Sequence, residues 1–108
     1  MQNRKLEGIE LQQACARLTG WELDLAQPCI VKSWDFVTFK AAVRFFNALA
    51  SLADLHDHHP ECLSAYSRMQ VRLWTHDAGG LTSQDMALAQ AIDQLVAHDF
   101  VDTLKPRT

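Results

Sequence analysis

The chain of 108 residues lacks several features that would assign it to a familiar class of protein. It has no hydrophobic run of about 20 residues, the length that a membrane-spanning helix needs. Its first residues, Met1 to Glu7, are too polar for a secretory signal peptide. Its basic residues are scattered and its formal net charge is -3, whereas a nucleic-acid backbone calls for a concentrated positive surface. We therefore expect a cytoplasmic protein with no direct contact to membrane or nucleic acid.

Cysteine is also scarce, with only Cys15, Cys29 and Cys62 and no C-x-x-C spacing. An odd number without that spacing favours free thiols in a reducing compartment over a disulfide framework. Hydrophobic residues make up 48% and charged residues 21%, the balance of a globular protein rather than a disordered one. The length fits a single domain over residues 1–108.

Apolar periodicity predicts a first helix from about Leu6 to Leu18, with Gly20 at the expected C-terminal cap. A second helix begins after Thr38, a suitable N-cap, and fades near Leu55, before a proline that cannot continue it. Its predicted apolar stripe comprises Phe39, Ala42, Val43, Phe46, Leu49, Ala50 and Ala53. We also expect a group of aromatic side chains in the core, namely Trp21, Trp34, Phe36, Phe39, Phe45 and Phe46.

A third helix is predicted to begin at Thr82, because Thr82 and Asp85 have the spacing of a capping box. Its apolar face comprises Leu88, Ile92, Leu95 and Val96. Between the helices, apolar and polar residues alternate over 21–25, 30–36 and 66–75, which predicts strands, and 61–64 leaves room for another. These elements favour an α+β architecture with an antiparallel sheet and helices on one face. An exposed sheet edge would be a natural dimer contact.

The chemistry is predicted around the histidines that follow the second helix. His58 and His59 are adjacent, and Pro60 allows the bend that would turn both toward one substrate. His76 follows the last strand. Histidine both donates and accepts protons near neutral pH, so such a group is typical of acid/base catalysis. Taken separately, the adjacent pair could be a solvated helix end and His76 an ordinary surface residue.

Two carboxylates accompany these histidines, and each has a structural alternative. Asp85 could cap the third helix, orient a histidine, or do both. Asp54 lies one helical turn before His58, where it could hold an imidazole or be solvated. The arrangement matches neither H-x-x-x-H, H-E-x-x-H nor paired C-x-x-C spacing, so we predict no metal site.

The composite pattern resembles that of the pterin-4a-carbinolamine dehydratase family. The pattern is an acidic residue, three residues, His-His-Pro, five residues, an aromatic residue, nine residues, His, eight residues and Asp. It is carried here by Asp54, His58, His59, Pro60, Tyr66, His76 and Asp85. The similarity extends to Gly20-Trp21, to Phe36-x-x-Phe39-x-x-Ala42 and to Thr75-His76 followed by Gly80-Leu81-Thr82, and spans roughly residues 11–96.

The resemblance implies a four-stranded antiparallel sheet with three helices packed on one face. It also implies a reaction, the removal of water from 4a-hydroxy-tetrahydrobiopterin to give the quinonoid dihydropterin. This step recycles the cofactor of aromatic amino-acid hydroxylases and needs no cofactor of its own. By the resemblance, His58, His59 and His76 surround the pterin as the catalytic set, with His58 and His76 sharing the acid/base work. Asp85, Asp54 and Pro60 then bind or orient the substrate and the histidines.

This chain differs from the family pattern at two positions. Cys62 stands where family members commonly have an aromatic residue, and Asp54 stands where they commonly have glutamate. Members of the family form homodimers or homotetramers, and some animal members are dimerisation cofactors of a homeodomain transcription factor. An interaction module without catalysis is therefore the alternative function. A divergent pterin-binding paralogue is a third, which the change at Cys62 keeps open.

Overall fold

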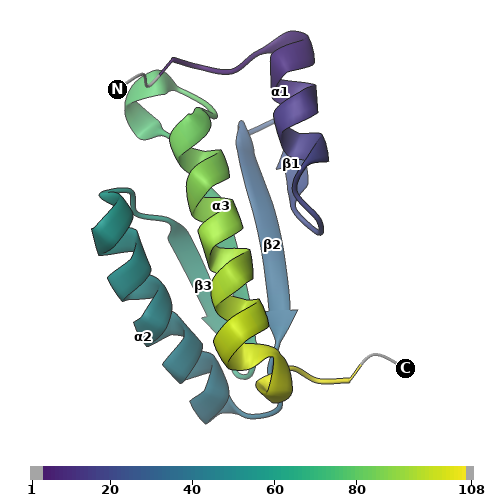
Figure 1. Ribbon diagram of the computed structural model, residues 1–108, viewed down its shortest axis with the longest axis vertical. Helices are drawn as coiled ribbons and strands as arrows, with labels where there is room; N and C mark the ends of the chain where they lie inside the picture. The colour runs from purple at the N-terminus through teal and green to yellow at the C-terminus, as the bar shows by residue number, and fades with distance from the viewer. Residues whose placement is uncertain (1–3, 107–108) are drawn as a thin grey trace.

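A four-stranded antiparallel sheet forms one of the two layers of the computed structural model, which describes residues 4–106. Within those residues it has four strands, β1 Glu22–Asp24, β2 Cys29–Asp35, β3 Glu61–Ala65 and β4 Arg68–Leu73. Their spatial order is β1-β2-β4-β3, so β2 and β4 are central and β1 and β3 are the edges. Figure 1 shows β2 between β1 and β3. The expected strand at 61–64 is confirmed as β3.

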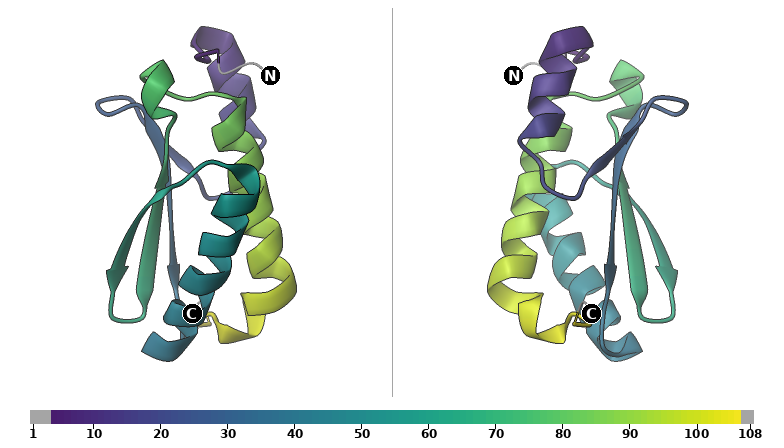
Figure 2. Two further views of the ribbon diagram at one scale, coloured as in Figure 1. Left: turned by 90° about the vertical axis from the view of Figure 1, so that its left-hand side faces the viewer. Right: turned by 90° about the vertical axis from the view of Figure 1, so that its right-hand side faces the viewer.

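Helices cover only one face of this sheet. The helices of the described region are α1 Gly8–Ala16, α2 Phe39–His56 and α3 Ser83–Leu95, and α3 continues through a π-helical turn at Val96–Phe100 and a 3-10 turn at Val101–Thr103. Figure 2 shows α2 and α3 side by side on one side of the sheet, with its other face uncovered. The predicted α+β class, with a four-stranded antiparallel sheet and three helices, is confirmed.

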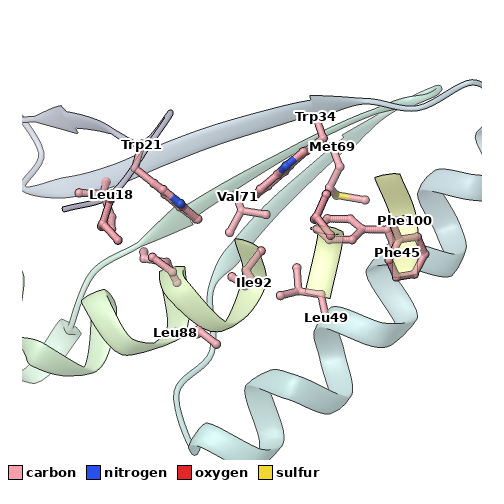
Figure 3. Close-up of a cluster of buried hydrophobic side chains, with 14 of the residues drawn as sticks. Leu18, Trp21, Trp34, Phe45, Leu49, Met69, Val71, Leu88, Ile92 and Phe100 are labelled. Carbon is pink, nitrogen blue, oxygen red and sulfur yellow. The ribbon is translucent and has the colours of Figure 1, made fainter. Parts of the chain in front are cut away.

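Strand alternation places the core between the sheet and the helices. On β4, Met69, Val71 and Leu73 are buried beneath the helices, while the residues between them face the uncovered side. Phe45 of α2 and Ile92 of α3 pack against this row from the helix side (Figure 3). The strand is shorter than the predicted 66–75, because Tyr66 adopts a left-handed turn with φ 54°.

The first helix ends earlier than its periodicity suggested. Its C-cap is Arg17, so Gly20 is not the cap. Gly20 instead lies in the turn before β1 with φ +83°, a conformation that favours glycine. A Cβ at this position would also meet the side chain of Lys32 at 3.0 Å.

The second helix buries a different set of aromatic residues from the predicted stripe. Phe45 is fully buried, whereas Phe39 and Phe46, both expected in the core, are 52% and 43% exposed. Val43 lies on the same exposed face, which we call the outer face of α2. The other predicted core aromatics, Trp21, Trp34 and Phe36, are buried. The predicted N-cap is confirmed, since the Thr38 side chain accepts a hydrogen bond from the Ala41 N–H.

Candidate active site

A bend at the end of α2 gives the two adjacent histidines different surroundings. The helix ends at His56, and Asp57 takes a left-handed conformation with φ 50°. The His58 N–H still donates to the Ala53 carbonyl at 3.1 Å, and Pro60 then leads into β3. After this bend, the His58 side chain is only 10% exposed and that of His59 is 62% exposed.

His58 faces a buried carboxylate at the start of α3. Its Nε2 lies 2.5 Å from Oδ1 of Asp85, whose side chain is fully buried. A hydrogen bond to one ring nitrogen fixes the orientation of an imidazole and sets which nitrogen carries the proton. With Nε2 engaged, Nδ1 is the ring nitrogen that remains for chemistry.

Asp85 serves two structural tasks at once. Its Oδ2 accepts the Thr82 N–H at 2.9 Å, so the predicted capping box of α3 is confirmed. The same oxygen accepts the Thr75 hydroxyl at 2.8 Å, and the Thr75 and Thr82 hydroxyl oxygens are 2.7 Å apart. The two predicted interactions of Asp85, with the helix end and with a histidine, therefore occur together.

His59 pairs with a different carboxylate. Its Nε2 lies 2.9 Å from Oδ1 of Asp54, and both side chains are largely exposed. His59, Asp54, Pro60 and Cys62 line a cavity of about 150 Å³, completed by residues of α2. The contact between Asp54 and a histidine, one of the two predicted possibilities, is thus made with His59 and not with His58.

His76 begins a 3-10 turn, His76–Ala78, which follows β4 after Trp74 and Thr75. It lines a larger cavity of about 460 Å³ together with Trp74, Arg72 and the turn between β1 and β2 (residues 26–29). The Arg72 guanidinium donates a hydrogen bond to Oε1 of Gln27 at 3.2 Å, and both residues line this cavity. An aromatic face, a cation and an imidazole thus share one cavity of a size typical for small ligands.

The three predicted histidines lie in different surroundings within residues 4–106. His59 and His76 line different cavities, and the link between His58 and His76 runs through Asp85 and Thr75. Thr75 was part of the family pattern but was given no role, although a buried hydroxyl must find a hydrogen-bond partner. Arg72, which lines the cavity beside His76, was also absent from the predicted site residues.

No cluster of three or more metal-ligating side chains occurs in the described part of the chain. None of the helices in that part has both the length and the apolar character needed to cross a membrane.

Comparison with known proteins gives one consistent family. Residues 4–95 match the family model described as pterin 4 alpha carbinolamine dehydratase. A protein of Rhizobium rhizogenes is 40% identical over 97 residues, which cover 90% of this chain and 96% of that protein. That protein is provisionally named a pterin-4-alpha-carbinolamine dehydratase.

Two solved structures share the fold. The transcriptional coactivator/pterin dehydratase of Brucella melitensis superposes with a TM-score of 0.81 at 33% identity, covering 85% of this chain and 98% of that one. A pterin dehydratase-like protein, a RuBisCO assembly factor in the alpha-carboxysome, superposes with a TM-score of 0.61 at 21% identity. It covers 70% of this chain and 88% of its own, and at that identity the likeness concerns the fold alone.

Proposed function

Because the chain belongs to the pterin 4 alpha carbinolamine dehydratase family, we propose that it removes water from 4a-hydroxy-tetrahydropterin. The observation that carries the proposal is the buried pair of His58 and Asp85 at the histidine-rich loop. A carboxylate that orients a histidine is a recurring device for proton transfer in enzymes.

The reaction requires two proton transfers. The bond between the 4a carbon and the hydroxyl oxygen breaks, and an acid protonates the departing hydroxyl so that it leaves as water. A base takes the proton of the neighbouring ring nitrogen, and a carbon–nitrogen double bond forms in the quinonoid dihydropterin. Imidazole and imidazolium can perform both steps near neutral pH, without a metal or an organic cofactor.

We assign these steps to His58 and His76. Asp85 accepts the Nε2–H of His58, so Nδ1 of His58 carries the lone pair of a base. His76, which lines the larger cavity, supplies the acid. His59, paired with Asp54 beside Pro60, lines the separate smaller cavity, so its proposed role is to orient the substrate from outside the cavity beside His76.

The larger cavity is the proposed place of the pterin ring. Its volume of about 460 Å³ lies within the usual range for small-molecule sites. Trp74 offers a flat apolar face to a planar ring, and Arg72 offers hydrogen-bond donors to its polar edge. A smaller aliphatic residue at position 74 would remove the stacking face and leave His76 in place.

The direct test replaces His76 by alanine and measures the dehydration of freshly generated 4a-hydroxy-tetrahydropterin. We expect the native chain to accelerate the reaction, and the His76→Ala variant to lose about 100-fold or more of that acceleration. His98→Ala is the matched control, because His98 lies far along the chain with its Nδ1 2.8 Å from the Gln94 carbonyl. Equal rates for the native chain and His76→Ala would remove His76 from the chemistry.

The second candidate function is a protein-interaction module. The outer face of α2 favours it, since Phe39, Val43 and Phe46 are exposed apolar side chains on one helix. The Brucella melitensis relative also combines the words coactivator and dehydratase in its name. In this alternative, substitutions on the outer face of α2 change binding to a protein partner and substitutions of His58 or His76 do not. A divergent pterin-binding paralogue would instead bind the ring without accelerating dehydration.

We further propose that the chain acts in the cytoplasm as a homodimer or homotetramer, next to an aromatic amino-acid hydroxylase that supplies its substrate. The outer face of α2 and the edge strand β3, on which Leu63 is 62% exposed, support self-association.

A further inference from the structure

Thr75 lies where the two histidine environments meet. It lies two residues after Leu73, the last residue of β4, and directly before His76, and it is only 6% exposed. Its hydroxyl contacts both Asp85 and Thr82. We propose that Thr75 is a positioning residue, which orients His58 through Asp85 and at the same time anchors the turn of His76.

The directions of the hydrogen bonds follow from the groups involved. A carboxylate only accepts, so the single Thr75 hydroxyl proton is donated to Oδ2 of Asp85 at 2.8 Å. The Thr82 hydroxyl must then donate to the Thr75 oxygen at 2.7 Å, while it accepts the Gln84 N–H at 3.2 Å. Each hydroxyl therefore donates to one acceptor: Thr75 donates to Asp85, and Thr82 donates to Thr75.

These hydrogen bonds determine which carboxylate oxygen of Asp85 faces His58. The Thr75 hydroxyl and the Thr82 N–H both donate to Oδ2, so the carboxylate is held in one rotation with Oδ1 toward His58. His58 completes the set through Nε2. Without the Thr75 hydroxyl, one of the two donors to Oδ2 is lost, and the carboxylate is free to rotate away from His58.

The backbone of the same residue holds His76. The Thr75 N–H donates to the Gly80 carbonyl at 2.8 Å, and the Ala78 N–H donates to the Thr75 carbonyl at 3.1 Å. These bonds close the turn His76–Ala78, which ends at Gly79 with φ 70°. One residue therefore links the orientation of His58 to the placement of His76. The role of this link in catalysis rests on the proposed function, whereas the orientation of the His58 ring by Thr75 does not depend on that function.

The test combines nitrogen NMR of the His58 ring with steady-state dehydration kinetics. In the native chain we expect the tautomer with its proton on Nε2. Thr75→Val removes the hydroxyl and keeps the branched shape, so it should give a mixture of His58 tautomers. It should also lower kcat between about 10- and 100-fold with little change in KM. Thr75→Ser restores the hydroxyl and should restore both readouts.

Thr103→Val is the control for the substitution itself, because the Thr103 hydroxyl bonds only locally to the Phe100 carbonyl in the part-buried turn after α3. The proposal is overturned if folded Thr75→Val keeps the native tautomer and the native kcat. A native His58 protonated on Nδ1 alone would overturn it without any variant, even if Thr75→Val failed to fold. If the native chain proved inactive, the tautomer data would still decide whether Thr75 orients His58.

Discussion

At the scale of single residues, His58 and His59 show how far environment can separate two identical side chains. The first is 10% exposed against a buried carboxylate, and the second is 62% exposed against an exposed one. Pro60 made the bend predictable from the sequence. Which histidine turns inward depends on the left-handed conformation of Asp57, with φ 50°. Aspartate adopts this conformation more readily than most residues, but its presence alone does not predict it.

Cys62 provides a residue-scale prediction with a defined dependence on pH. Burial raises the pKa of its thiol from 9.0 to about 11, and the nearby Glu61 carboxylate contributes. Between those pH values the unfolded chain releases a proton that the folded chain retains. The resulting stability is therefore fully present below about pH 9 and is lost as the pH rises toward 11.

The measurement is urea unfolding at about pH 8 and about pH 10 for the native chain and for Cys62→Ala. We expect the native chain to lose more stability over this interval than the variant does. Cys15→Ala is the comparison, since burial raises the pKa of the Cys15 thiol as well. An identical loss in the native chain and Cys62→Ala would contradict this origin of the alkaline instability.

At the scale of elements, α2 shows why a helix can be predicted more easily than its buried face. The predicted stripe and the observed buried face share Ala42, Leu49 and Ala53. The sheet covers Phe45, while the adjacent Phe46 lies 43% exposed. Both faces of this helix are apolar enough to pack, so periodicity alone cannot decide which one the sheet covers. The caps were predictable because a hydroxyl at an N-cap acts locally.

The cap of α2 gives an element-scale prediction. Thr38→Ala removes the oxygen that accepts the Ala41 N–H at 3.0 Å, so it should lower the free energy of unfolding by about 1 kcal/mol. Thr38→Ser keeps an accepting hydroxyl and should remain close to the native stability. Urea denaturation followed by circular dichroism measures both variants. If serine were as destabilising as alanine, the loss would not come from the cap.

At the scale of the whole molecule, the fold class followed from the order of helical and alternating segments. The spatial strand order β1-β2-β4-β3 did not, because pairing depends on contacts far apart in the sequence. The same limit applies to the site. The cavity beside His76 is closed by the turn at residues 26–29, and nothing in the local sequence of either segment indicates that they meet.

Self-association is the prediction that belongs to this scale. If the outer face of α2 is an interface, Phe46→Glu places a charge in it and should reduce the mass measured by light scattering to that of a smaller species. Asn47→Glu adds the same charge at the next, exposed position and should leave the mass unchanged. Native mass for both variants would mean that copies of the chain associate elsewhere.

The most direct test of the account is the rate of dehydration of 4a-hydroxy-tetrahydropterin with the native chain, His58→Gln and His59→Gln. Glutamine keeps a polar side chain but cannot exchange a proton as imidazole does. We predict acceleration by the native chain, a loss of about 100-fold or more in His58→Gln, and a smaller loss, expressed mainly in KM, in His59→Gln. Folded His58→Gln with the native rate would contradict the assignment of the buried pair of His58 and Asp85 to the chemistry.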